Sequence, residues 1–154
     1  MSGPKFDNSS FMHHMNHNRL IAAAAATLAL TLATAQADDK KMDVSKLPPA
    51  AAQTGVTYEK DIKAIFEKSC VKCHSGDKAK GKLHMDSLEG VLKGGKDGKA
   101  VTPGKSAESP LLFAVAHVGD EDDFMPPKGN KANIGPLTKE QVGLIRAWVE
   151  QGAK

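Results

Sequence analysis

Residues 70–74 read CVKCH: two cysteines separated by two residues, with a histidine directly after the second. This is the spacing at which c-type haem is attached to a chain. On a helix that turns about 100° per residue, Cys70 and His74 lie about 40° apart and Cys73 lies about 60° to the other side, so the three side chains share one face. The thiols can form thioethers with the two haem vinyl groups while the imidazole coordinates the iron. The stretch therefore predicts one covalent haem c, bound by Cys70 and Cys73, with His74 as an axial ligand of the iron.

Three other kinds of site use two cysteines at this spacing. A thioredoxin-like redox pair belongs at the start of a helix in a βαβ unit, whereas these cysteines follow a predicted helix. A zinc site needs a fourth strong ligand, for which the mature chain offers His84 and His117. A structural disulfide would leave His74 without a role. Haem attachment accounts for both cysteines and the histidine, so we prefer it.

A secretory signal is predicted at the N-terminus. Residues 20–33, LIAAAAATLALTLA, form an uncharged run of 14 that follows Arg19 and precedes the small-residue pattern Ala-Gln-Ala at 35–37. The run is shorter than the roughly 20 apolar residues that a membrane-spanning helix needs. We therefore expect residues 1–37 to be a cleaved signal peptide, the mature protein to be periplasmic or secreted, and no stable membrane insertion to remain after cleavage.

The composition narrows the class of protein. The chain has 154 residues, and its 21 Lys and Arg nearly balance its 18 Asp and Glu. A large multidomain enzyme is excluded by this length, and duplex binding would require a concentrated basic face, so we expect no nucleic-acid partner. The five Phe, one Tyr and one Trp provide few large rings for a core, which leaves room for a bound group.

Four runs of apolar residues at helical spacing predict four helices, over about residues 57–69, 88–93, 110–118 and 139–151. Each run has its own start signal. These signals are Thr57, Asp86 or Ser87, Ser109 followed by Pro110 at the first helical position, and the capping box Thr138–Gln141.

The domain organisation follows from these runs. Residues 38–54 carry prolines, small residues and charges without apolar periodicity, so we predict a flexible linker there. No stretch shows the sustained two-residue alternation of a strand, so residues 55–154 are predicted to be one all-α domain. The loops at 75–86, 94–108 and 119–136 are long and polar for so small a domain, which is expected if they wrap a bound group.

Met125 is the predicted second axial ligand of the iron. It lies in Asp-Phe-Met-Pro-Pro, where the residue before a proline is biased towards extended backbone and the two prolines restrict the backbone after it. Such a loop can hold a thioether at a fixed position. Met85 is only 11 residues beyond His74 and is a weaker candidate, His117 would give bis-His ligation, and an open sixth position is the remaining alternative.

The chain resembles class I cytochromes c, and among them the small planctomycete-type cytochrome c domain, over about residues 56–152. The resemblance implies a cytochrome c-like fold of about four helices and long loops wrapped around one haem. It also implies that the first and last helices cross beside the haem, where Phe66 and Trp148 would meet. Many class I proteins have a proline soon after the attachment motif, whereas the first one here is Pro103, so the carbonyl that orients His74 is left open. The stretches that carry the resemblance are DIKAIFEKSCVKCHSG (61–76), KGKLHMDSLEGVLKGG (80–95), VTPGKSAESPLL (101–112), FMPP (124–127) and LTKEQVGLIRAWVEQGA (137–153).

The function that these features favour is electron transfer rather than catalysis. We expect a monomeric periplasmic cytochrome that carries single electrons between unidentified redox protein partners through a His/Met-ligated haem. Residues 72–105 contain 8 lysines against 4 acids, and residues 106–127 contain 5 acids and no Lys or Arg; such a polarised surface accelerates encounter with a partner. The alternatives are a haem sensor or peroxidase-like enzyme with an open sixth position, and a docking module of a larger complex.

Overall fold

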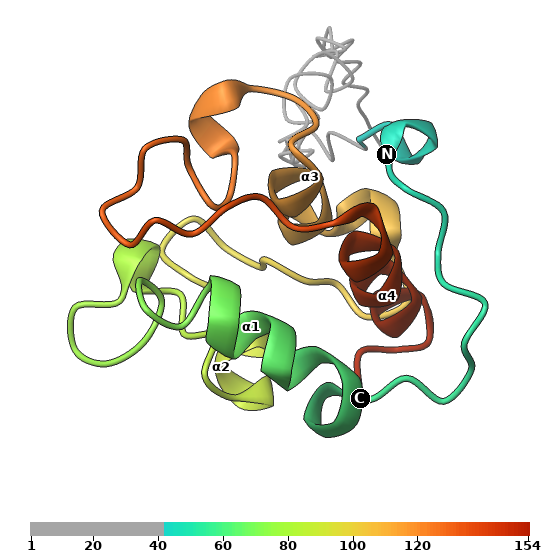
Figure 1. The fold of residues 1–154 in the computed structure, drawn as a ribbon. Coiled ribbons are helices and arrows are strands. Elements are labelled where there is room, and N and C mark those ends of the chain that lie inside the picture. Colours follow the sequence, from blue (N-terminus) through green and yellow to red (C-terminus); the bar gives the residue numbers. More distant parts are fainter. Residues whose placement is uncertain (1–41) are drawn as a thin grey trace, which may run out of the picture. The chain divides into compact units, whose positions relative to one another are not determined.

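The structure is a computed structural model that describes residues 42–154 (Figure 1). These residues form four α-helices and no strand: α1 Lys63–Ser69, α2 Leu88–Lys93, α3 Pro110–Ala116 and α4 Lys139–Glu150. The all-α prediction is therefore confirmed for residues 42–154. None of the helices in this part of the chain combines the length and the apolar character that a membrane span requires. The predicted signal peptide, residues 1–37, lies outside the described residues.

The first predicted helix forms as a π-helical turn, Tyr58–Ile62, that continues directly into α1. Thr57 caps it as expected, because its side chain accepts a hydrogen bond from the Lys60 N–H. The apolar stripe is buried: Ile62 and Phe66 are fully covered. The helix ends at Ser69, one residue before the first cysteine of CVKCH.

The last helix, α4, begins with the predicted capping box. Thr138 Oγ1 accepts from the Gln141 N–H at 3.2 Å, and Gln141 Oε1 accepts from the Thr138 N–H at 2.9 Å. The helix buries one face, which includes Ile145 and Trp148. Its sequence signals are local, so this element forms where they place it.

An aromatic cluster joins the first and last helices. The rings of Phe66 and Trp148 lie 6.2 Å apart at 85°, an edge-to-face pair, and Tyr58 packs 6.1 Å from Phe66 and 6.2 Å from Trp148. The carbonyl of Lys154 accepts from both the Tyr58 N–H at 2.7 Å and the Trp148 indole N–H at 3.0 Å. The expected meeting of Phe66 and Trp148 is thus present.

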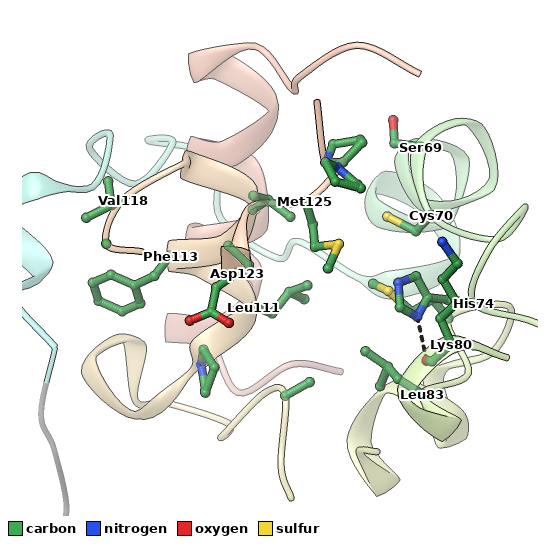
Figure 2. Close-up of a pocket in the computed structure, with 18 of the residues that line it drawn as sticks. Ser69, Cys70, His74, Lys80, Leu83, Leu111, Phe113, Val118, Asp123 and Met125 are labelled. Carbon is green, nitrogen blue, oxygen red and sulfur yellow. Dashed lines mark hydrogen bonds between the residues drawn. The ribbon is translucent and has the colours of Figure 1, made fainter. Parts of the chain in front are cut away.

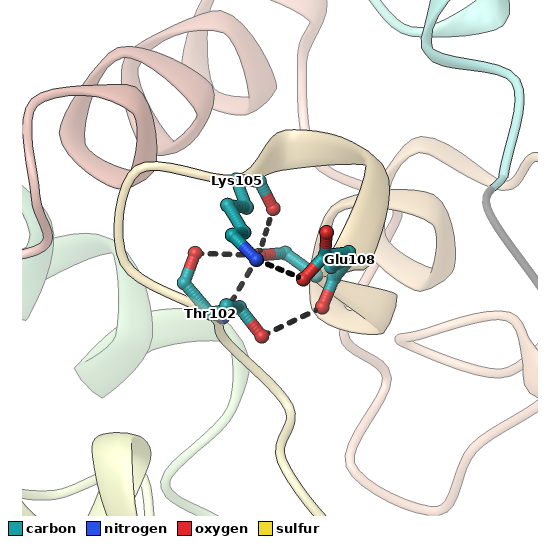
Figure 3. Close-up of polar contacts among 4 residues, drawn as sticks. Thr102, Lys105 and Glu108 are labelled. Atoms are coloured by element: carbon teal, nitrogen blue, oxygen red, sulfur yellow. Dashed lines mark hydrogen bonds and ion pairs between the residues drawn. The ribbon is translucent and has the colours of Figure 1, made fainter. Parts of the chain in front are cut away.

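The start of α3 differs in one respect from the prediction. Pro110 occupies the first helical position, but Ser109 makes no side-chain cap. Its buried hydroxyl instead accepts from the Thr102 N–H at 2.9 Å and donates to the Lys105 carbonyl at 2.8 Å. Thr102 also donates to the Glu108 carbonyl, and Lys105 pairs with the Glu108 carboxylate (Figure 3). Ser109 therefore closes the preceding loop rather than the helix end.

The described part of the predicted flexible linker, residues 42–54, differs from that prediction because it packs on α4. Leu47 is only 6% exposed. The Ala51 N–H donates to the Gly143 carbonyl at 2.9 Å, and Arg146 Nη1 donates to the Pro48 carbonyl at 3.0 Å. An extended, proline-rich segment buries isolated residues rather than one periodic face, so its sequence shows no helical or strand pattern.

Replacing Leu47 with Ala tests this packing. We expect Leu47→Ala to lower the free energy of unfolding by about 2 kcal/mol or more, because a buried leucine leaves a cavity when it is truncated. Chemical denaturation would measure the change. Ala52→Ser, at an exposed position of the same segment, should stay within about 0.5 kcal/mol of the parent protein. If the two variants had equal free energies of unfolding, residues 42–54 would not be packed on α4, and the prediction of a flexible linker would stand.

Candidate functional site

A cavity of about 860 Å³ is lined by the end of α1, the loop after it, α3 and the loop that precedes α4 (Figure 2). This volume lies in the range of sites that hold a small molecule or cofactor. Most of the lining is apolar or sulfur-bearing, including Leu83, Met85, Leu111, Val115, Met125 and Ile134.

The CVKCH motif lies in a turn that follows α1. The prediction that Cys70, Cys73 and His74 share one face of a helix is therefore wrong about the helix. The Cys70 N–H closes the last helical hydrogen bond to Phe66, and the chain then tightens, with the Cys73 and His74 N–H groups both donating to the Cys70 carbonyl at 3.0 Å. This turn keeps all three motif side chains on the cavity wall. The three side chains therefore still face one common site, although the helix has ended before them.

The two cysteines are free thiols in different surroundings. Cys70 is 8% exposed, and burial raises the pKa of its thiol to about 12, so it is protonated at neutral pH. Cys73 is half-buried. Both line the cavity, where their sulfurs can bind a group that enters it.

His74 is oriented by a hydrogen bond to the backbone of the next loop. Its Nδ1 lies 3.1 Å from the Lys80 carbonyl oxygen (Figure 2). Because a carbonyl only accepts, Nδ1 carries the proton and Nε2 keeps its lone pair. Burial lowers the pKa of His74, against the opposing effect of its hydrogen bonds to backbone, and this favours the neutral ring that ligates metals. The carbonyl partner that the sequence left open is thus Lys80.

The loop that carries this carbonyl is itself fixed to the motif. The Lys80 N–H donates to the Cys73 carbonyl at 3.0 Å, and the Met85 N–H donates to the His74 carbonyl at 2.8 Å. The Met85 carbonyl in turn accepts from the buried Tyr58 hydroxyl at 3.1 Å. Backbone bonds on both sides of His74 therefore hold the ring and its acceptor in one rigid unit.

Met125 reaches the cavity from the opposite wall. Its N–H donates to the Ala114 carbonyl of α3 at 3.0 Å, and its thioether points towards Cys70 and His74 (Figure 2). The four predicted site residues, from segments about 50 residues apart, thus line the same cavity. Met85 also lines it but is 2% exposed in the core, whereas His117 is not among the lining residues.

Asn130 is a site residue that the sequence analysis missed. Its amide nitrogen donates to the carbonyls of Pro127 at 2.9 Å and Ile134 at 2.7 Å, and its amide oxygen accepts from the Ile134 N–H at 3.1 Å. These bonds shape the loop after Met125, and Asn130 also lines the cavity. Asparagine in a turn-rich segment was the available signal.

The donor set fits a covalently attached haem. An apolar cavity holds two thiols, a neutral imidazole with one free nitrogen, and a thioether on the facing wall. No group of three or more His, Cys, Asp or Glu side chains in residues 42–154 is arranged to hold a metal ion.

Gly81 offers a test of the loop that orients His74. Its φ is +62°, and an added Cβ would meet no atom within 4 Å, so a side chain there would strain only the backbone. We expect Gly81→Ala to lower the free energy of unfolding by about 1 kcal/mol. Gly135→Ala is the matched control, because Gly135 has equal space and no positive φ. Equal denaturation midpoints for the two variants would contradict the left-handed conformation of Gly81.

Comparison with known proteins agrees with the geometry. Residues 70–129 match the family model described as Planctomycete cytochrome C, a span that contains the CVKCH motif, α2, α3 and Met125. Neither the curated proteins nor the solved structures that were compared gave a match to the chain. The matched family implies a covalently bound haem c and a cytochrome role. Residues 70–129 are therefore similar to the planctomycete cytochrome C family, and this match supports a planctomycete-type cytochrome c domain.

Proposed function

We propose that the protein is a periplasmic c-type cytochrome that carries single electrons between redox partners through one haem with His74 and Met125 as axial ligands. The observation that carries this proposal is the cavity on which the CVKCH turn and the Met125 thioether lie opposite each other. Bound haem supplies an iron that accepts and releases one electron.

The cysteines have an anchoring role in this proposal. Each thiol would supply the sulfur of one thioether bond to a haem vinyl group, with the thiol hydrogen passing to the vinyl carbon. Cys70, Cys73 and His74 lie in one tight turn and line the same cavity. Covalent attachment suits an exported protein because the group cannot be lost by dilution.

The two axial side chains are held from separate parts of the fold. His74 is fixed by the Lys80 carbonyl, and Met125 by its backbone bond to α3. Leu111 and Val115 also line the cavity and are buried, and their apolar side chains disfavour water there. Ligands that stay in place in both oxidation states favour electron transfer over binding of a small molecule.

Surface charge supports short-lived encounters with a redox protein. Lys72, Lys78, Lys80 and Lys82 are exposed around the attachment turn, whereas Asp120–Asp123 are exposed before Met125. Opposite patches of this kind raise the rate of encounter more than the affinity. Such a carrier acts as a monomer that binds one partner at a time.

Exchange of Met125 for Leu tests the axial ligand. We expect the haem-loaded Met125→Leu protein to lose the far-red absorption band of a methionine sulfur bound to ferric iron, and its reduced form to bind carbon monoxide rapidly. Met85→Leu is the matched control, since it makes the same change at a second cavity methionine and should keep the band. A band that persists in Met125→Leu would assign the ligand to another sulfur, such as that of Met85. Absence of the band already in the parent protein would favour the haem sensor or peroxidase-like enzyme with an open sixth position.

The attachment residues are tested by mass. Protein made with a working haem-ligation system should remain heavier by one haem after denaturation, and the double variant Cys70→Ser, Cys73→Ser should have the mass of the polypeptide alone. Each single variant keeps one thiol and is expected to show partial attachment. Colourless wild-type protein with two titratable thiols would disprove covalent haem.

A further inference from the structure

We propose that His117 and Phe124 are positioning residues that together hold Met125 in place. The inference rests on the proposed ligation by Met125 and adds the means by which the fold presents that thioether. The two rings are stacked, with centroids 4.6 Å apart and planes within 7° of parallel. Phe124 directly precedes Met125, so a constraint on its ring is a constraint on the methionine backbone.

The stack acts together with a backbone anchor. The Ala114 carbonyl accepts from the His117 N–H at 3.2 Å and from the Met125 N–H at 3.0 Å, which ties both ends of the intervening loop to one point of α3. The Val118 N–H donates to the Phe113 carbonyl at 3.0 Å and completes the reversal of the chain at the end of the helix. The helix is itself well fixed, because Leu112 is fully buried and Val115 nearly so.

The loop between the anchors is exposed and acidic. Residues 119–123 are exposed, and four of them are consecutive acids whose negative charges repel one another. One exposed contact, Lys128 to Glu121 at 3.7 Å, offsets little of this repulsion. The ring stack is a side-chain contact that opposes an outward movement of Phe124 and hence of Met125.

His117 adopts a conformation that requires support from its surroundings. It is the C-cap of α3 with φ +55°, in the left-handed region that non-glycine residues seldom occupy. Its buried Nε2 has no hydrogen-bond partner among residues 42–154. Both features are locally unfavourable, and such positions persist where neighbouring contacts hold them. The stack on Phe124 is one such contact.

The test separates the ring of His117 from its backbone conformation. Asparagine tolerates the left-handed region but carries no ring, whereas phenylalanine keeps a ring that can stack. We expect the haem-loaded His117→Asn protein to lose much of the far-red band and to bind carbon monoxide faster by a factor on the order of 2 to 10. His117→Phe should retain both the band and the slow binding, which a role in overall stability alone would not predict.

A second pair of variants repeats the test from the other ring. Phe124→Leu keeps an apolar side chain without a ring and should behave as His117→Asn does, while Phe124→Tyr should behave as the parent protein. If His117→Asn does not fold, this pair still tests whether the ring stack positions Met125.

The outcomes distinguish this inference from the function on which it rests. Retention of the band and of slow carbon monoxide binding in both ring-less variants overturns the positioning role, as does equal loss in ring-less and ring-bearing variants. If Met125→Leu also leaves the spectrum unchanged, the proposed ligation fails and the positioning role falls with it. If only Met125→Leu alters the spectrum, the ligation stands and His117 and Phe124 are packing residues.

Discussion

The hydrogen bond between His74 Nδ1 and the Lys80 carbonyl is the constraint on which the candidate site depends. It selects the tautomer, directs the free nitrogen away from the loop, and couples the ring to backbone that is bonded back to Cys73. With the ring in this one orientation, His74 lines the same cavity as the two thiols and the Met125 thioether. The aromatic cluster of Tyr58, Phe66 and Trp148 is bonded to the same unit. The Cys70 N–H donates to the Phe66 carbonyl, and the Tyr58 hydroxyl donates to the Met85 carbonyl.

The elements that the sequence predicts well are those with local signals. The capping box at Thr138, the cap at Thr57 and the apolar stripe that contains Phe66 each involve residues within one or two turns of helix, so spacing alone identifies them. The CVKCH motif belongs to the same class, because its three functional side chains are close in the chain. Met125 could be proposed from the stiffness of its proline-rich loop.

The remaining features depend on contacts between distant segments. Any residue offers a carbonyl, so nothing in the sequence marks Lys80 as the partner of His74. Ser109 has the appearance of a helix cap, but the loop folded against it takes up its hydroxyl. Residues 42–54 have the composition of a linker, yet the absence of a side chain at Gly143 lets them lie directly on α4, where an added Cβ would come within 2.6 Å of the Pro49 carbonyl oxygen.

The placement of Trp148 has an optical consequence. It is the one tryptophan in the sequence, it is fully buried, and it touches Phe66, whose carbonyl is bonded to the Cys70 N–H. A strongly absorbing group attached at Cys70 would take up the excitation energy of this indole, so its emission would be dim while the chain is folded and would brighten as the two separate. With such a group attached, the protein would contain an intrinsic fluorescent reporter of its own compaction, without an added label.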